Sequence, residues 1–255
     1  PGDETLRVSH LTVAPSPSEK PFLHDISLHV RAGEVLGIGG LMGAGRTELI
    51  MHLFGAWGHR IEGEIAMGEQ LLSHRTPQGA LNAGLALVSE DRKRYGLVLD
   101  ESIGFNFSLS SIGRILRGLL IDQEAEAQTN QKYFDELRVK APSLETTVGT
   151  LSGGNQQKIV IGKALMTEPK VILLDEPTRG IDVGAKLEVY ELINQLTKDG
   201  RAVILVSSEL PELIGMSDRI LMLSEGRIGG TFTREEATPE TLLAAAMGAS
   251  TMTNA

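Results

Sequence analysis

The chain has 255 residues, no cysteine and a formal net charge of −9. It therefore has no disulfide or thiolate metal site, and an acidic chain lacks the basic footprint that tight nucleic-acid binding needs. No apolar run is long enough to span a bilayer, and no signal peptide is evident, so we expect any membrane association to go through a protein partner. Because the first residue is Pro1 rather than methionine, we expect a piece of a longer protein.

The first third of the chain contains several short apolar segments that predict strands. Residues 6–13 alternate between apolar and polar side chains, which favours an edge strand, and a proline-rich surface loop follows over 14–21. Further strands are expected at 25–30, 35–38 and 64–67. The composition and this pattern fit a compact α/β protein.

A glycine-rich loop follows the expected strand at 35–38. Gly40 and Gly45 hold the spacing of the phosphate-binding pattern G-x-x-x-x-G-K-[ST], and Thr47 supplies its hydroxyl. Arg46 takes the place of the lysine, and its planar fork is bulkier than a compact ammonium. The loop predicts a site that binds nucleotide and is altered for catalysis. Taken alone, it also fits a glycine turn without a ligand.

The middle of the chain begins with a buried strand at 85–88 that ends in a run of charged residues. For residues 91–94 we favour a solvated charge cluster. Further on, Asp122 is expected to cap a helix over 123–138 that carries an apolar face. The pattern fits an amphipathic helix pair that covers its own core.

The motif L-S-G-G-N-Q-Q-K at 151–158 opens onto an expected helix. Its serine and glycines present a hydroxyl and backbone N–H groups at a helix start, which favours anions. The apolar strand expected at 171–174 then delivers Asp175 and Glu176 at its carboxyl end, where α/β folds place chemistry. A simple capping role for these two carboxylates is the weaker alternative.

The last third continues the alternation of helices and strands. A helix is expected over 183–199, then strands over 202–206 and 219–223, and a final helix capped at Thr238. Ser208 follows the second of these segments. A helix N-cap there is at least as well supported as a catalytic role.

L-S-G-G-N-Q-Q-K followed by I-L-L-D-E-P-T resembles the ATP-binding cassette (ABC) ATPases. The segments G-L-M-G-A-G-R-T-E-L, S-E-D-R-K-R-Y-G-L and D-E-P-T-R-G-I-D-V-G-A-K resemble the second, C-terminal nucleotide-binding half of the double-length ATPases of bacterial monosaccharide importers. Residues 53–57 and Glu62-Gly63 look most like the xylose type, with the ribose and galactose types close behind.

This resemblance implies the fold class and the domains. It implies an α/β, ABC-type P-loop NTPase with a RecA-like parallel-sheet core, an N-terminal antiparallel β-subdomain and an inserted helical subdomain. The core with its β-subdomain would take residues 1–95 and 150–248, the helical subdomain 96–149, and a flexible tail 249–255.

The resemblance also assigns roles toward ATP and Mg²⁺. The nucleotide-binding residues would be Gly40, Gly43, Ala44, Gly45, Arg46, Thr47 and Glu48. The signature motif, which acts on the partner's ATP, would be Ser152, Gly153, Gly154, Asn155 and Gln156, with Asp182 in the D-loop. Glu176 would be catalytic, and Thr47 and Asp175 would hold Mg²⁺. Glu90 stands where the family usually has the Q-loop glutamine, and Ser208 where it has the H-loop histidine. Phe22 is the ring nearest to the place where the family stacks adenine.

The implied function is to power the import of a monosaccharide from the cytoplasmic face of the bacterial inner membrane, as a peripheral subunit. The partners would be the N-terminal nucleotide-binding half of the same protein, transmembrane permease subunits through the helical subdomain, and indirectly a periplasmic sugar-binding protein, with no nucleic acid. The alternative is a nucleotide-binding half with a degenerate P-loop, which has little turnover alone and supplies LSGG to a partner. A soluble ABC protein of translation or DNA repair fits an acidic chain without a basic linker less well.

Overall fold

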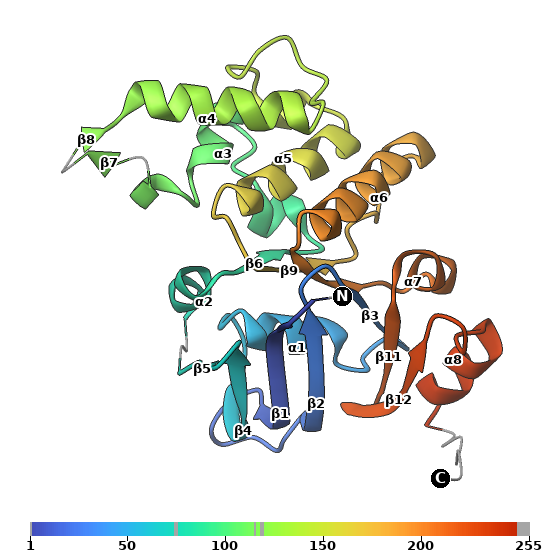
Figure 1. Cartoon of the computed structure of the whole chain (residues 1–255). Coiled ribbons are helices and arrows are strands. Elements are labelled where there is room, and N and C mark those ends of the chain that lie inside the picture. Colours follow the sequence, from blue (N-terminus) through green and yellow to red (C-terminus); the bar gives the residue numbers. More distant parts are fainter. Residues whose placement is uncertain (1, 74–75, 115, 118–119, 249–255) are drawn as a thin grey trace. The chain divides into compact units, whose positions relative to one another are not determined.

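The computed structural model describes residues 2–73, 76–114, 116–117 and 120–248 (Figure 1). The chain divides into two compact units. The first unit comprises residues 1–87, 170–176 and 194–255, and the second comprises 88–169 and 177–193. The second unit therefore takes in more of the chain than the segment 96–149. The tail expected at 249–255 lies outside the described residues.

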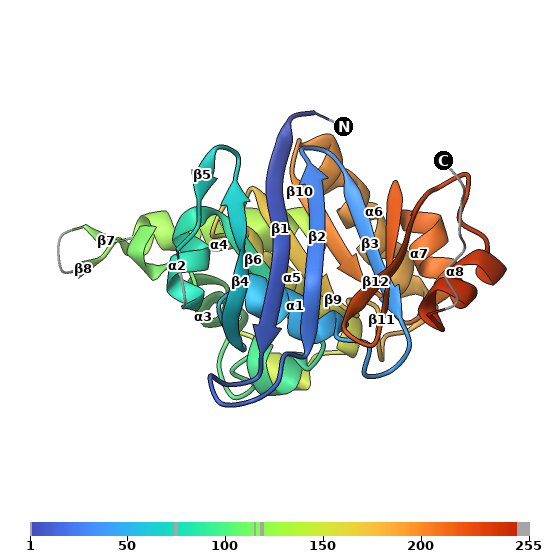
Figure 2. The same cartoon turned by 90° about the horizontal axis from the view of Figure 1, so that it is seen from below.

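An antiparallel sheet of four strands lies in the first unit, in the order β2-β1-β4-β5. Its members are β1 (Glu4–Ala14), β2 (Leu23–Arg31), β4 (His59–Met67) and β5 (Gln70–Leu71). Figure 2 shows β1 between β2 and β4, with which it pairs on its two sides. The expectation of an edge strand at 6–13 was therefore wrong. The alternation of apolar and polar side chains indicates that one face of this strand is buried. It does not indicate whether other strands pair with it on one side or on both.

A second sheet of six strands has the order β12-β11-β3-β10-β9-β6. Its strands are β3 (Val35–Gly40), β6 (Leu85–Val88), β9 (Val171–Asp175), β10 (Ala202–Val206), β11 (Arg219–Ser224) and β12 (Arg227–Thr233). Neighbouring pairs among β9, β10, β3 and β11 are parallel, whereas β12 runs antiparallel to β11. Every residue of β9 and β10 is buried, as expected for central parallel strands.

One hydrophobic core joins both sheets of the first unit. It includes Leu6 and Leu11 of β1, Ile38 of β3, and Leu49 and Ile50 of α1. The helices of this unit are α1 (Arg46–Leu53), α2 (Pro77–Ala83), α7 (Leu210–Met216) and α8 (Pro239–Ala246). The predicted cap of the last helix is confirmed, because the Thr238 hydroxyl accepts a hydrogen bond from the Thr241 amide.

The second unit contains α3 (Ile103–Ser108), α4 (Gln123–Glu136), α5 (Gly153–Leu165) and most of α6 (Val183–Lys198). It also holds a π-helical turn over Arg92–Gly96 and a short hairpin of β7 (Leu116–Arg117) and β8 (Leu120–Ile121). Asp122 caps α4 as predicted. The helix ends at Glu136, before the expected 138, because Arg138 adopts a left-handed backbone.

Across the described parts of the chain, none of the helices combines the length and the apolar character needed to cross a membrane.

Candidate nucleotide site and signature face

The predicted phosphate loop connects β3 to α1 in the first unit. Gly40, Gly43 and Gly45 all have positive φ angles, of 150°, 80° and 101°, which other residues rarely adopt. Gly45 is the N-cap of α1 and makes no side-chain cap, so the first-turn N–H groups have no side-chain partner there. Backbone donors at a helix start suit an anion such as a phosphate group.

Tight packing holds the underside of this loop. A Cβ atom at Gly40 would lie 2.6 Å from the Leu223 carbonyl oxygen, and one at Gly45 would lie 2.7 Å from Leu23 Cδ2. The Ala44 carbonyl accepts a hydrogen bond from the Gly226 amide at 3.0 Å. A Cβ at Gly43 would meet nothing within 4 Å. The loop is therefore packed against neighbouring residues at Gly40, Ala44 and Gly45, and it is open at Gly43.

Thr47 and Asp175, the predicted magnesium ligands, lie together. The Thr47 hydroxyl donates to Asp175 Oδ1 at 3.4 Å, and Asp175, at the end of β9, is 2% exposed. Burial raises the pKa of Asp175 to about 6; the Thr47 hydrogen bond and Arg46 oppose the rise, while Glu176 and Glu48 add to it. A hydroxyl and carboxylates in one place are the hard oxygen ligands that Mg²⁺ takes, so the residues present fit that ion.

Glu176 follows directly and has both of its carboxylate oxygens engaged. Its Oε1 accepts from the Arg46 guanidinium at 3.4 Å, and its Oε2 accepts from the Ser208 hydroxyl at 3.1 Å. Glu176 is 9% exposed and has a φ of 48°, a left-handed backbone that costs about 1–2 kcal/mol in a residue with a side chain. Its amide donates to the Val206 carbonyl of β10. The strained backbone and these contacts together fix the carboxylate.

Ser208 is not a helix cap. The N-cap of α7 is Glu209, and the Glu209 amide donates to Ser207 rather than to Ser208. The capping alternative at Ser208 was therefore wrong. Sequence reasoning could not see its actual partner, because 32 residues separate Ser208 from Glu176.

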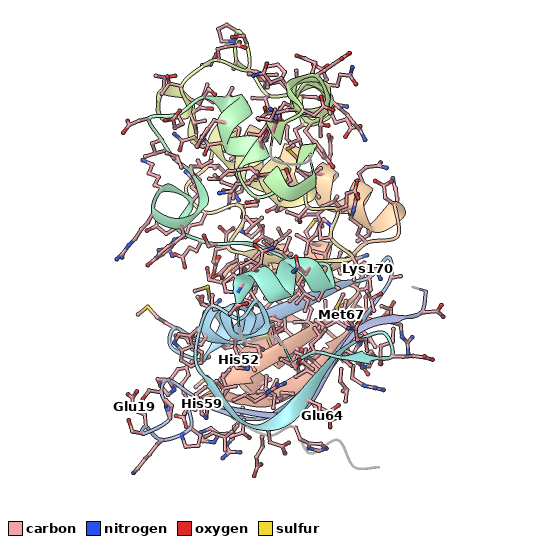
Figure 3. All side chains as sticks on the ribbon, turned by 90° about the vertical axis from the view of Figure 1, so that its left-hand side faces the viewer. Glu19, His52, His59, Glu64, Met67 and Lys170 are labelled. Atoms are coloured by element: carbon pink, nitrogen blue, oxygen red, sulfur yellow. The ribbon has the colours of Figure 1, made fainter. Side chains whose placement is uncertain are left out.

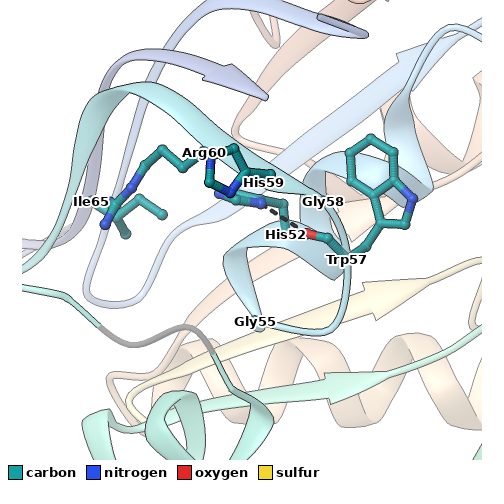
Figure 4. Close-up of a pocket in the computed structure, with 7 residues that line it drawn as sticks. All are labelled: His52, Gly55, Trp57, Gly58, His59, Arg60 and Ile65. Atoms are coloured by element: carbon teal, nitrogen blue, oxygen red, sulfur yellow. Dashed lines mark hydrogen bonds between the residues drawn. The ribbon is translucent and has the colours of Figure 1, made fainter. Parts of the chain in front are cut away.

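Phe22, the ring considered for adenine, packs edge-on against Trp57 with ring centroids 5.9 Å apart. Trp57 also borders a pocket near the start of β4 that the sequence did not predict (Figure 4). In that pocket His52 Nδ1 donates to the Trp57 carbonyl at 2.9 Å. Figure 3 shows His52 and His59 among the side chains of this unit. The lining residues are His52, Gly55, Trp57, Gly58, His59, Arg60 and Ile65.

The signature motif begins α5 in the second unit. The Ser152 hydroxyl accepts from the Asn155 amide at 3.4 Å and from its side-chain nitrogen at 3.0 Å. Asn155 Oδ1 in turn accepts from the Lys140 amide at 2.8 Å. Gln156 is buried and donates to the Val148 carbonyl. The polar side chains after the glycines therefore brace the loop on which they stand.

Asp182 of the D-loop lies beside the signature motif. Its carboxylate accepts from the Ala185 amide at 3.0 Å and so supports the start of α6. A Cβ atom at Gly154 would lie 2.5 Å from the Ala185 Cβ, so glycine is needed for this close approach. The two motifs share one small pocket, lined by Lys140, Ser152, Gly154, Asn155, Asp182, Gly184, Ala185 and Glu188.

Glu90, at the predicted Q-loop position, forms an ion pair with Arg179. Arg92 lies two residues further on and is half-buried, so the expectation of a solvated cluster at 91–94 was wrong for this residue. Its guanidinium donates to the carbonyls of Arg179 at 3.1 Å and Gly180 at 3.4 Å. Desolvation lowers the pKa of Arg92, and the charge of Asp91 works in the opposite direction.

Ion pairs between α5 and α6 were also missed by sequence reasoning. Lys158 of the signature motif is 5% exposed as a side chain and lies 2.7 Å from Glu188 of α6. Lys140 reaches the same carboxylate at 3.1 Å. Hydrogen bonds from these two ammonium groups lower the pKa of Glu188. A lysine at the end of a glycine motif gives no sign that its side chain will be buried against a carboxylate 30 residues later.

Comparison with known proteins identifies the family of this chain. The family profile described as ABC transporter matches residues 23–179. The chain is 51% identical over 249 residues to the xylose import ATP-binding protein XylG of Moorella thermoacetica, covering 97% of this chain and 49% of that protein. The XylG of Geobacillus kaustophilus is 47% identical over 247 residues, with the same two coverages. The chain thus spans about half the length of the curated relatives it matches.

Solved structures show the same fold. A nucleotide-free ATP-binding cassette from an ABC transporter superposes with a TM-score of 0.81 at 22% identity, covering 95% of this chain and 96% of that one. An ATP-binding cassette of an ABC transporter in its ADP conformation also gives 0.81, at 20% identity, covering 96% and 99%. The predicted fold class, a P-loop NTPase with an antiparallel β-subdomain beside a largely parallel sheet, is confirmed.

Proposed function

Because this chain belongs to the ABC transporter family, we propose that it is the C-terminal nucleotide-binding half of a double-length ATPase that powers monosaccharide import, of the xylose type. The observation that carries the proposal is the cluster at the strand ends of the first unit, where Thr47, Asp175 and Glu176 come together. Two relatives of twice the length are named for xylose import, which supports the sugar class. The segments 96–149 and 1–95 with 150–248 would be its helical and core domains.

ATP would lie on the phosphate loop and its helix start. The proposed contacts are Gly40, Gly43, Ala44, Gly45, Arg46, Thr47 and Glu48. Thr47 and Asp175 would hold Mg²⁺, and the bound ion neutralises phosphate oxygens during attack by water. The open side of the loop at Gly43 leaves the space that a phosphate needs.

Glu176 is the candidate group for orienting the attacking water. Its Oε1 accepts from Arg46 and becomes more available to a water molecule when that guanidinium turns to another anion. Phosphate oxygens are suitable competitors, because charge-assisted contacts to arginine are strong. Ser208 would keep Oε2 and hold the carboxylate in place while Oε1 accepts a proton.

The signature motif and Asp182 would act on nucleotide bound by the facing half. In this proposal Ser152, Gly153 and Gly154 complete the site that carries the lysine-bearing phosphate loop. Asn155 and Gln156 brace them from behind. Permease subunits would bind through the helical region, a periplasmic sugar-binding protein would act through them, and the assembly would sit on the cytoplasmic face of the inner membrane.

A second candidate is a half that binds nucleotide and has little turnover of its own. The engagement of both Glu176 oxygens favours it, because the Arg46 guanidinium and the Ser208 hydroxyl take up part of the carboxylate's capacity to accept a hydrogen bond from water. The two candidates agree on the signature motif and differ on the Arg46 site. A glutamate retained at 176 favours turnover there once Arg46 has moved.

ATP-driven uptake of labelled xylose into vesicles tests the proposed function. The vesicles would hold the full-length ATPase that contains this chain together with its permease. Ser152→Arg places a bulky cation at the signature motif and is expected to abolish uptake. The control Ser73→Arg changes an exposed serine outside both clusters and should leave uptake unchanged. Xylose uptake that is independent of ATP, or unaffected by Ser152→Arg, contradicts the proposal.

A further inference from the structure

Arg92 connects three segments of the second unit that are far apart in the sequence. We propose that it is a positioning residue, which holds the signature motif and the D-loop together as one preformed face. The proposal rests on the proposed function, because that face would act on nucleotide bound by a facing half. Neither the motif pattern nor the family resemblance assigned Arg92 a role.

The Arg92 guanidinium is hydrogen-bonded to the backbone of the D-loop segment. Nη1 and Nη2 donate to two consecutive carbonyls, those of Arg179 and Gly180, at the entry to the D-loop. The planar guanidinium of an arginine donates to two acceptors at once in a fixed geometry. The ammonium group of a lysine imposes no such geometry. The Arg92 Nε atom is buried and has no hydrogen-bond partner among the described residues, so the hydrogen bonds described for this guanidinium are the two to the D-loop carbonyls.

The same guanidinium lies against the signature motif. A Cβ atom at Gly153 would lie 2.8 Å from Arg92 Nη2 and 3.1 Å from the Gly180 carbonyl oxygen. Both distances are shorter than ordinary contacts, so a side chain at residue 153 would displace the Arg92 guanidinium or press on the Gly180 carbonyl. Arg92 therefore fills the junction between the start of α5 and the entry to the D-loop.

Glu90 adds an ion pair beside this junction. Its carboxylate contacts the Arg179 side chain while Arg92 contacts the Arg179 carbonyl. The strand-end segment that begins at Glu90 thus holds one D-loop residue by both its backbone and its side chain. Displacement of this segment is expected to move the D-loop with it.

The consequence for the reaction follows from geometry. From Arg179 and Gly180 the chain reaches Asp182, whose carboxylate supports the start of α6. Gly154 in turn packs so closely on Ala185 that a displacement of one motif is expected to disturb the other. Small misplacements of a catalytic surface cost large factors in rate, so loss of the Arg92 contacts should lower turnover with little effect on nucleotide binding.

The test compares Arg92→Gln with Arg94→Gln in two measurements. Arg94 is a matched control two residues away, because its guanidinium is exposed and lies over the Tyr95 ring. Hydrogen exchange on this chain alone is expected to be at least about tenfold faster over 179–187 in Arg92→Gln and unchanged in Arg94→Gln. In Arg92→Lys, the exchange rate over 179–187 is expected to be close to that in Arg92→Gln.

The second measurement is steady-state ATP hydrolysis by this chain paired with a half that carries a lysine-bearing phosphate loop. Arg92→Gln should lower kcat by about ten- to a hundredfold with KM for ATP changed less than about twofold. Equal exchange and equal kcat in the two glutamine variants, or full activity of Arg92→Lys, would overturn the proposal. Absence of turnover in the wild-type pair would contradict the proposed function instead, and the exchange data would still decide the role of Arg92.

Discussion

Arg46 stands where the phosphate-binding pattern has lysine, and its guanidinium contacts Glu176, the proposed catalytic carboxylate. The pair is mostly enclosed, with side-chain exposures of 15% and 9%. An enclosed ion pair has few water molecules to weaken it. Glu176 and a bound phosphate would therefore compete for the Arg46 guanidinium, and a change at residue 46 acts on both phosphate binding and the freedom of Glu176.

We predict that Arg46→Lys raises the ATP turnover of this site several-fold. A lysine at position 46 would offer a compact ammonium group to phosphate. It would lack the planar guanidinium that contacts Glu176 in the wild type. Steady-state hydrolysis by the variant and by the wild type measures the change. Adding Glu176→Gln to Arg46→Lys should abolish the gain. A turnover below that of the wild type would show that the arginine assists the reaction.

Asp175 makes the free energy of unfolding of the chain depend on pH. Its folded pKa of about 6 exceeds the ordinary value of 3.8, so the folded state binds the proton more tightly than the unfolded state. The stability that this group contributes is present below pH 3.8 and is lost as the pH rises to about 6. The full loss corresponds to about 3 kcal/mol.

Asp175→Asn should therefore stabilise the nucleotide-free chain at pH 8, by up to about 3 kcal/mol, and much less at pH 4.5. Urea unfolding at the two pH values measures this difference. In the wild type, Mg²⁺ should raise the unfolding midpoint at pH 8 and lose this effect below about pH 6, because a protonated carboxyl binds the ion poorly. A gain in Asp175→Asn that is equal at both pH values would contradict this account.

At the scale of elements, α5 and α6 are joined by Glu188. Two ammonium groups reach this carboxylate, and one of them, from Lys158, is nearly buried. Lys158 also donates to the Arg138 carbonyl. Removing the carboxylate would leave a buried cation with a single carbonyl partner, and an uncompensated buried charge is costly.

Glu188→Ala is expected to lower the free energy of unfolding by about 2 kcal/mol. Glu191→Ala on the same helix is the control, because its ion pair with Arg138 is largely exposed and should contribute no more than about 0.5 kcal/mol. Urea midpoints with unchanged slopes would report the difference. Equal midpoints for the two variants would show that Lys158 does not depend on Glu188.

Several elements followed directly from the sequence, because a single local cause fixes each of them. The buried aliphatic runs at 171–174 and 202–206 form β9 and β10, and Asp122 caps α4 as predicted. The strand β12 was missed, since its central Gly229 and Gly230 weaken the strand pattern. A Cβ at Gly229 would lie 2.2 Å from the Ala245 carbonyl oxygen, so close packing under α8 requires glycine there.

The candidate site also has features that the sequence predicts locally and features that it does not predict. Motif spacing identified the phosphate loop, the paired carboxylates and the signature serine, since these follow from the chain locally. The partners of these groups were not predictable. Arg46 and Glu176 are 130 residues apart, and 87 residues separate Arg92 from Arg179. Contacts of that range depend on the packing of whole elements, which residue patterns do not report.

At the scale of the whole molecule, each compact unit carries one functional cluster. The first unit holds the phosphate loop with Thr47, Asp175 and Glu176, and the second holds the signature motif and Asp182. In the proposed function, a chain with this division would contribute to two different nucleotide sites when paired with another half. Because both halves would be needed for a complete site, we expect the isolated chain to be a monomer at modest concentration, which light scattering would check.

The most direct test of this account is MgATP hydrolysis by the chain alone and after mixing with a half that bears a lysine P-loop, each with and without Glu176→Gln. We predict slow hydrolysis by the chain alone over a wide range of protein concentration. The mixture should hydrolyse ATP, and most of that activity should survive Glu176→Gln in this chain, because its signature motif serves the other site. Rapid hydrolysis by the chain alone that Glu176→Gln abolishes would contradict the account.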